Sequence, residues 1–221
     1  MPLMPLPLGP LRFNAIILAG GRSSRLNGTP KALLQFEGST LLSAALDAAA
    51  GASACAVAGP PGLAAAVGNT GPAVLLVRED PPFSGPAAAV EAAWTALAER
   101  DRKAGGTPPD WTLVLACDMP FIAGAVDALL AAARADPPDS LLAVDESGRM
   151  QPLAALYRTA PLGAALHRPD RPGGLENLSM KRLLARVQWR DVAVPAHSTA
   201  DIDTWEDARR WSVNTGSTGN P

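Results

Sequence analysis

The feature that most constrains the fold of this chain is a regular alternation between short apolar runs and longer alanine-rich segments. The apolar runs have the length and continuity of strands buried on both faces, while the alanine-rich segments are typical of helices. Strands that alternate with helices are joined by right-handed crossovers, which build a mostly parallel, twisted sheet with helices on both faces. We therefore expect a single-domain, three-layer α/β/α fold of the Rossmann-like kind. The expected strands are 13–18, 55–58, 74–77, 111–116, 141–144, 153–157 and 189–194, and the expected helices are 41–50, 86–102, 122–135 and 178–186.

The two ends of the chain differ in composition from its middle. The 221 residues suit one α/β domain, and no linker divides them. Residues 1–12 are interrupted by prolines and lack the basic start of a secretory signal peptide, so we expect a disordered lead-in. Residues 212–221 are small and polar, and we expect a disordered tail there. The predicted domain is therefore 13–211.

The composition argues against several classes of protein. A formal net charge of −2 provides no general attraction to nucleic acid or to a membrane surface, so we expect neither as a partner. No apolar stretch is both long enough and sufficiently free of proline and glycine to span a membrane. Cys55 and Cys117 lie in apolar runs and form no metal-binding motif. We expect buried free thiols and a cytoplasmic protein.

The loop after the first strand has the composition of a phosphate-binding loop. Gly20 and Gly21 follow the strand directly, and glycines let backbone N–H groups approach phosphate oxygens closely. Arg22, Arg25 and Lys31 could neutralise the phosphate charge. The loop matches neither the Walker A motif nor the dinucleotide-binding fingerprint. The alternative is a surface turn with solvated basic residues, but its position after a buried first strand favours phosphate binding.

Asp118 follows the fourth expected strand and is the best candidate for a metal ligand. Ligands of α/β sheets collect at the carboxyl ends of the strands, so this carboxylate should share an edge with the glycine loop. Mg²⁺ takes carboxylate and phosphate oxygens, and one or two protein carboxylates suffice. Asp118 could instead cap the next helix. A phosphate loop in the same crevice favours the metal.

Two further segments each allow two interpretations. Gly85 and Pro86 open a helix and could present backbone groups to a flat base, or could form an ordinary connection between a strand and a helix. Near the end of the chain, Asp203 could be a second metal ligand. The same segment also has the pattern of a helix start with Thr204 or Asp203 as the cap, which we favour. One residue could serve both purposes.

Taken together, these segments resemble the nucleotidyltransferase superfamily that activates small phosphorylated compounds, and within it the molybdenum cofactor guanylyltransferases. The opening LAGGRSSRLNGTPKALL is similar to that family's LAGG-x-S-x-R-M-G-G-x-D-K-x-L signature. The later stretches SGPAAAV, LACDMPF, QPLAALYR and DIDTWEDARR are similar to its GPLAG, CD-x-P-F, PL-x-AL-Y and N-x-N-T-P-E-D-L elements. The resemblance extends from about residue 13 to about residue 211 and implies the fold of the nucleotide-diphospho-sugar transferases.

The resemblance also implies roles for individual residues. Asp118 would hold Mg²⁺ and, with Arg25 and Lys31, would act on the triphosphate. Asp80 would lie beside the nucleotide, although the motif aligns almost as well with Glu79. The remaining residues that would contact the nucleotide are Leu18, Ala19, Gly20, Gly21, Gly85 and Pro86.

The activity implied is transfer of GMP from GTP to a molybdopterin-type cofactor, with release of pyrophosphate. Partners would then include enzymes that make or accept this cofactor. Pro30 stands where the guanylyltransferases usually have Asp and where cytidylyltransferases usually have Pro. A CTP-dependent or other nucleotidyltransferase with a different phosphorylated acceptor is therefore the main alternative. A catalytically silent nucleotide-binding accessory protein is the third.

Overall fold

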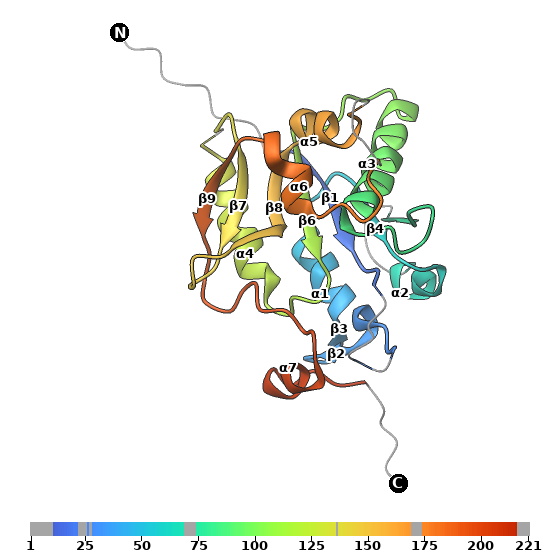
Figure 1. Cartoon of the computed structure of the whole chain (residues 1–221), viewed down its shortest axis with the longest axis vertical. Helices are drawn as coiled ribbons and strands as arrows, with labels where there is room; N and C mark the ends of the chain where they lie inside the picture. The colour runs from blue at the N-terminus through green and yellow to red at the C-terminus, as the bar shows by residue number, and fades with distance from the viewer. Residues whose placement is uncertain are drawn as a thin grey trace.

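A seven-stranded sheet in the order β5-β4-β1-β6-β8-β7-β9 forms the centre of the molecule (Figure 1). The computed structural model describes residues 11–21, 26, 28–68, 74–135, 137–168 and 174–215. The predicted lead-in up to residue 10 and the predicted phosphate ligand Arg25 lie outside the described residues. In sequence order the strands of this sheet are β1 (Phe13–Leu18), β4 (Cys55–Ala58), β5 (Val74–Val77), β6 (Trp111–Ala116), β7 (Ser140–Val144), β8 (Met150–Arg158) and β9 (Trp189–Ala193).

The sheet is parallel except for one strand. β5, β4, β1 and β6 run parallel to one another, and β7 runs parallel to β9. β8 is antiparallel to both β6 and β7. The cause is the short turn 145–149, because a parallel connection needs a crossover of about a dozen residues or more. In this turn the Asp145 carboxylate accepts hydrogen bonds from the N–H groups of Ser147 and Arg149, which supports a tight hairpin.

Helices cover both faces of the sheet, which confirms the predicted three layers. One core packs α1 (Leu41–Ala48) and α4 (Ile122–Ala133) against Ala15 and Ile17 of β1. The opposite core contains Ile16 of the same strand, so successive side chains of β1 face opposite layers. The helices of this second layer are α3 (Pro86–Lys103), α5 (Thr159–Leu166) and α6 (Met180–Leu183), which η4 (Leu184–Arg186) extends.

Several elements were not predicted. They are η2 (Lys31–Leu33), β2 (Gln35–Phe36), β3 (Ser39–Thr40), η3 (Pro61–Leu63), α2 (Ala64–Val67) and α5. α5 contains Pro161 and Gly163, which usually disfavour helices. Proline is tolerated in the first helical turn because its missing N–H has no partner there. Gly163 is required by packing, since a Cβ atom at this position would lie 2.6 Å from Cζ2 of Trp94.

A third, smaller apolar cluster joins the end of the chain to the β2–β3 hairpin. It contains Leu34 and Phe36 from the hairpin segment together with Ile202, Ala208 and Val213. α7 (Trp205–Arg210) belongs to this cluster and lies beside the hairpin in Figure 1. Because Val213 is buried and Asn214 exchanges backbone hydrogen bonds with Gln35, residues 212–215 belong to the fold, contrary to the expected tail. Residues 216–221 of that tail lie outside the described residues.

The structure also bears on the two cysteines and on the question of a membrane-spanning helix. Cys55 and Cys117 are buried free thiols, as the apolar runs around them predict. No helix in the described part of the chain combines the length and the apolar character that crossing a membrane requires.

The glycine in α5 yields a test of the packing. We expect Gly163→Ala to lower the free energy of unfolding by about 1–3 kcal/mol, because the rigid Trp94 ring must move. Gly124→Ala in α4 is the matched control, since its Cβ atom would lie at an ordinary 3.4 Å from Cγ of Pro195. The control should be neutral or stabilising by up to about 1 kcal/mol. Urea denaturation followed by circular dichroism measures both, and equal stability of the two variants would contradict the packing argument.

Candidate active site

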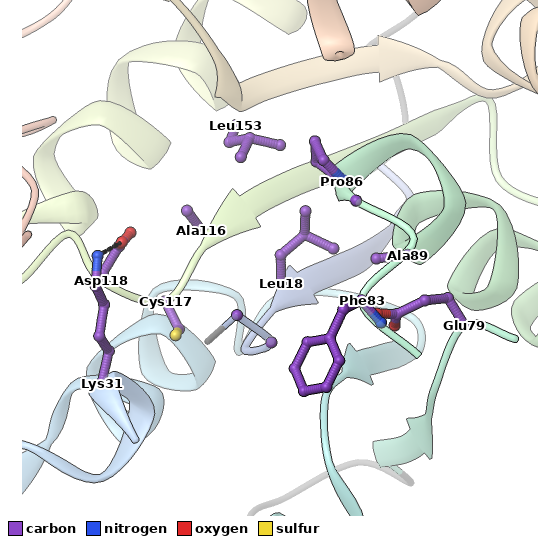
Figure 2. Close-up of a pocket in the computed structure, with 13 residues that line it drawn as sticks. Leu18, Lys31, Glu79, Phe83, Pro86, Ala89, Ala116, Cys117, Asp118 and Leu153 are labelled. Atoms are coloured by element: carbon purple, nitrogen blue, oxygen red, sulfur yellow. Dashed lines mark hydrogen bonds and ion pairs between the residues drawn. The ribbon is translucent and has the colours of Figure 1, made fainter. Parts of the chain in front are cut away.

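A pocket of about 290 Å³ opens between β1 and β6, at the carboxyl ends of these strands. Here the chain places successive strands on opposite sides of β1, so the sheet has a topological switch point. From β1 the chain continues to β4 on one side, while β6 lies on the other side of β1. The backbone N–H of Cys117 donates to the carbonyl of Leu18 at 3.0 Å, which holds the ends of the two strands together. The loops that follow diverge, and this is where α/β sheets bind ligands. The residues that line the pocket are Leu18, Gly20, Gly21, Lys31, Glu79, Phe83, Gly85, Pro86, Ala89, Ala116, Cys117, Asp118 and Leu153 (Figure 2).

The Lys31 ammonium group binds two carboxylates at the polar end of this pocket. Its Nζ atom lies 2.9 Å from Oδ2 of Asp118 and 2.5 Å from Oδ1 of Asp203. The three residues are far apart in sequence: Lys31 begins η2, Asp118 follows β6, and Asp203 precedes α7. The Lys31 and Asp118 side chains are about one fifth exposed, so the pair is partly shielded from water.

Backbone contacts bring Asp203 to this position. The N–H of Ile202 donates to the carbonyl of Asp118 at 2.9 Å, and Ile202 is completely buried in the third apolar cluster. The chain therefore crosses the carboxyl edge of the sheet with its next side chain directed at Lys31. The same cluster holds Leu34, at the end of η2, so burial of apolar surface positions both partners of the ion pair.

The segment around Asp203 resolves the choice between helix cap and functional carboxylate. Thr204 is the N-cap of α7, and it forms a reciprocal capping box with Asp207. The Thr204 hydroxyl accepts from the N–H of Asp207, while the Asp207 carboxylate accepts from the N–H of Thr204. Because Thr204 caps the helix, the side chain of Asp203 is left to bind Lys31. The favoured alternative of a cap is correct for Thr204 and wrong for Asp203.

The acidic surroundings dominate the electrostatics of Lys31. Burial by itself lowers the pKa of the Lys31 ammonium, but the charges and hydrogen bonds of Asp118 and Asp203 outweigh it, so the net pKa is raised. The pKa of nearby Asp201 is raised by burial, then by the charges of Asp203 and Asp118. Burial raises the pKa of the Cys117 thiol well above its ordinary value, so this thiol stays protonated and is no nucleophile.

The donor atoms at this end of the pocket suit a hard divalent cation. Asp118 and Asp203 already direct carboxylate oxygens at one positive charge, the Lys31 ammonium. Within the described ranges, no three His, Cys, Asp or Glu side chains gather as a metal-binding group. Mg²⁺ is commonly bound by one or two protein carboxylates, and its remaining ligands are substrate phosphates and water. The residues present therefore fit the predicted cation.

The loop between β5 and α3 forms the other end of the pocket. The Glu79 carboxylate accepts a 2.9 Å hydrogen bond from the N–H of Phe83, and both residues line the pocket. Gly85 precedes α3 with a φ angle of +92°, a conformation that favours glycine. A Cβ atom there would also lie 3.5 Å from the backbone of Asn177, so the loop 174–179 closes against it. In Figure 2, Glu79 and Phe83 lie at one end of the pocket and Lys31 and Asp118 at the other.

Most of the described residues predicted for the site line this pocket, and three do not. Asp203 is not among the lining residues and contacts the site through Lys31. Ala19 is buried, and its N–H is used by the sheet, donating to the carbonyl of Ala58 at 2.8 Å. Asp80 is exposed and does not line the pocket, whereas its neighbour Glu79 does. The residues brought together as predicted are Leu18, Gly20, Gly21, Lys31, Gly85, Pro86 and Asp118.

Sequence reasoning missed several lining residues. Leu153 comes from the antiparallel strand β8, whose place beside β6 was not predicted. Ala89 lies one turn into α3, on the face that also carries Pro86. Phe83 is a bulky aromatic residue within an otherwise polar and proline-rich loop. That unusual composition is the one signal in the sequence that could have identified it.

Comparison with known proteins agrees with this geometry. The family profile described as the MobA-like NTP transferase domain matches residues 15–192, which is most of the chain. The chain belongs to this family. Its members are nucleotidyltransferases, which bind a nucleoside triphosphate and a phosphorylated acceptor. No curated protein sequence shows significant similarity to the chain.

Solved structures share the fold over almost their whole lengths. Molybdopterin-guanine dinucleotide biosynthesis protein A from Archaeoglobus fulgidus is 19% identical, with a TM-score of 0.63 over 90% of this chain and 96% of that one. Rv0371c from Mycobacterium tuberculosis H37Rv is 25% identical, with a TM-score of 0.62 over 90% and 97%. The 2-C-methyl-D-erythritol 4-phosphate cytidylyltransferase from Thermus thermophilus is 23% identical, with a TM-score of 0.55 over 89% and 96%.

The Lys31 ion pairs predict a pH-dependent contribution to stability. We expect Lys31→Met to lower the free energy of unfolding at pH 7 by about 1–2 kcal/mol, since it leaves two neighbouring carboxylates without their counter-charge. The pKa of Lys31 is raised in the folded state, so its contribution is complete below the ordinary value of 10.5 and is lost as the pH rises through the folded pKa. The difference from the wild type should therefore shrink above pH 10.5.

Lys103→Met is the control for this experiment. Lys103 pairs with Glu99 at 2.8 Å, but both side chains are more than half exposed. Its loss should change the free energy of unfolding by less than about 0.5 kcal/mol. Urea denaturation at several pH values measures both variants, and a Lys31→Met effect no larger than that of Lys103→Met would contradict the stabilising role.

Proposed function

We propose that this protein transfers GMP from GTP to a molybdopterin-type cofactor and releases pyrophosphate. The observation that carries the proposal is the Lys31 ammonium between the carboxylates of Asp118 and Asp203, at one end of a mostly apolar pocket. A lysine next to two hard oxygen ligands is suited to a triphosphate with its metal. We place the activity in the cytoplasm, whose reducing conditions suit the free thiols of Cys55 and Cys117.

The reaction needs positioning and charge stabilisation more than covalent chemistry. A phosphate oxygen of the acceptor attacks the α-phosphorus of the nucleotide, a new P–O bond forms, and the bond to the β-phosphate oxygen breaks. The pyrophosphate leaves with that electron pair. The attacking phosphate is already ionised at neutral pH, so no general base is required. The described residues that line the pocket include no histidine, and the proposed step needs none.

Each group at the polar end has a part in this step. Backbone N–H groups of Gly20 and Gly21 would hold phosphate oxygens, as glycine loops after a first strand do. The Lys31 ammonium would move away from Asp118 and Asp203 and bind the triphosphate. It would then stabilise the charge that builds up on the leaving pyrophosphate. Arg25, outside the described residues, would add a second cation. Asp118 and Asp203 would then hold the metal.

We propose Mg²⁺ as the cation. When bound, it supplies charge neutralisation for the triphosphate and the departing pyrophosphate. A related structure, Rv0371c from Mycobacterium tuberculosis H37Rv, was solved in complex with manganese, which supports the use of a divalent cation. That relative is 20% identical to this chain and has a TM-score of 0.59.

The choice of GTP rests on Glu79 at the opposite end of the pocket. Guanine carries adjacent N–H donors on its ring and amino nitrogens, and a carboxylate can accept from both. Cytosine presents one amino donor next to an acceptor nitrogen, which a carboxylate would repel. The likeness to the molybdopterin-guanine dinucleotide biosynthesis protein of Archaeoglobus fulgidus supports the same choice and the molybdopterin acceptor. Cytidylyl transfer remains the second candidate, favoured by Pro30 and by the likeness to the Thermus thermophilus cytidylyltransferase.

Pyrophosphate release tests the reaction. With molybdopterin and Mg²⁺, we expect turnover with GTP to exceed turnover with CTP by about tenfold or more, since cytosine would place an acceptor nitrogen against the Glu79 carboxylate. Asp118→Ala should reduce the rate by about 100-fold or more because it removes a metal ligand.

Asp127→Ala is the matched control, because Asp127 is an exposed carboxylate of α4 outside the pocket. It should retain the wild-type rate. Faster turnover with CTP would replace guanylyl by cytidylyl transfer. Undiminished pyrophosphate release by Asp118→Ala would refute the metal site.

Substitution of two adjacent acids tests which of them recognises the base. We expect Glu79→Gln to reduce the preference for GTP over CTP by about tenfold, because the amide keeps the shape of the side chain but loses a charge-assisted acceptor. Asp80→Asn should leave the preference unchanged, since Asp80 is exposed and does not line the pocket. The measurement is kcat/KM for both nucleotides. A reversed pattern would assign base recognition to Asp80.

A further inference from the structure

Two buried polar side-chain atoms have no hydrogen-bond partner in the part of the chain that the structure describes. They are Oδ1 of Asn14, in β1, and Nε1 of Trp94, in α3. Native proteins pair nearly all of their buried polar atoms, either with other protein atoms or with ordered water, because an unpaired one costs stability. Two such atoms in one place therefore indicate a site for a small polar ligand.

Asn14 and Trp94 line the same small cavity. Asn14 lies two residues before Ile16 in β1, so its side chain faces the layer that contains α3. It is near the amino end of β1, whereas the candidate active site is at the carboxyl end. The space in the cavity that is open to water is about 10 Å³, close to the minimum that holds one water molecule. The other lining residues are Leu97, Ala98, Asp101, Pro108, Thr112 and Thr159.

The Asn14 amide is held in one orientation by Asp101. Nδ2 of Asn14 donates to Oδ2 of Asp101 at 2.9 Å. The reversed amide would place its oxygen against this carboxylate, so the oxygen is the atom that needs a donor. Oδ1 of the buried Asp101 lies 3.1 Å from Nη1 of Arg100, which provides a counter-charge. The carboxylate therefore needs no cation in the cavity to balance its charge.

A pair of threonine hydroxyl groups adds to the polar lining of the cavity. Oγ1 of Thr112, in β6, lies 2.9 Å from Oγ1 of Thr159, in α5, and either hydroxyl can be the donor. The hydroxyl that accepts keeps its own proton for another acceptor, and the hydroxyl that donates keeps its lone pairs. This pair can therefore provide a ligand with a further contact of either polarity.

The chemistry of the two unpaired atoms selects the ligand. The indole Nε1–H of Trp94 only donates, and the amide oxygen of Asn14 only accepts. A metal ion or an ammonium group cannot accept from Nε1–H. An anion cannot donate to the amide oxygen and would be repelled by Asp101. A water molecule can both accept and donate, and buried waters typically form about three hydrogen bonds.

We propose that this cavity binds one water molecule, which accepts from Nε1 of Trp94 and donates to Oδ1 of Asn14. Its second proton is donated to the Asp101 carboxylate or to the threonine pair. The water thereby links β1 to α3, whose first turn carries Pro86 at the candidate active site. The inference is independent of the proposed function, since none of the described residues around this cavity lines the active-site pocket.

Crystallography at a resolution that shows ordered water tests the site directly. In the wild type we expect one solvent peak within about 3.2 Å of both Nε1 of Trp94 and Oδ1 of Asn14. Trp94→Phe should lose this peak, because the N–H donor is removed, and should keep the hydrogen bond between Asn14 and Asp101. Trp189→Phe is the control and should keep the peak, since Trp189 lies in β9 and does not line the cavity.

Nuclear Overhauser spectroscopy tests the same site in solution. The indole N–H resonance of Trp94 is identified by its absence from the spectrum of Trp94→Phe. In the wild type it should show cross-peaks to water with opposite signs in laboratory-frame and rotating-frame spectra, as for a water that tumbles with the protein. Asn14→Leu should abolish these cross-peaks because it removes the acceptor. Thermal denaturation checks that each variant is folded.

Three results would overturn the water site. The first is a wild-type cavity without a solvent peak, and the second is an unchanged peak in Trp94→Phe. The third is a pair of water cross-peaks with the same sign in both kinds of spectrum, which indicates exchange of the indole proton or a passing water. Where a variant does not fold, the wild-type solvent peak and cross-peaks decide the question.

Discussion

The ion pairs of Lys31 with Asp118 and Asp203 connect the three parts of the chain on which the site depends. Lys31 belongs to the segment after β1, Asp118 to the end of β6, and Asp203 to the approach to α7. Two carboxylates this close to one another repel unless a cation lies between them. The lysine therefore holds the two carboxylates together. Under the proposed function, a divalent cation would take the place of the ammonium group, which would then bind the triphosphate.

The third apolar cluster makes this arrangement possible. It is separate from the two cores on the faces of the sheet and packs the β2–β3 hairpin against Ile202, Ala208 and Val213. Burial of these side chains brings the end of the chain across the carboxyl edge of the sheet. The charged residues of the site are thus positioned by apolar neighbours. Burial of these neighbours contributes more to the free energy of unfolding than a partly exposed ion pair does.

Many elements of the fold could be predicted because their signals are local. The strands 13–18, 55–58, 74–77 and 111–116 are confirmed at both ends, since each is a short and predominantly apolar run. The helix expected at 178–186 is shorter, with α6 continued by a turn of tighter helix in η4. α5 was missed because Gly163 has a poor intrinsic preference for helix, and only Trp94, far away in sequence, explains why glycine is needed.

By itself, the sequence determined the alternation of strands and helices, the glycine loop after β1 and the position of Asp118 after β6. These features depend on residues that are neighbours along the chain. Only the tertiary structure decided that β8 runs antiparallel, that Thr204 rather than Asp203 caps α7, and that Glu79 rather than Asp80 lines the pocket. Each of these depends on a contact or a direction in space that local composition does not specify. The pairing of Lys31 with Asp203 is the clearest case, because the burial of Ile202 and Leu34 in one apolar cluster joins residues that are 172 positions apart.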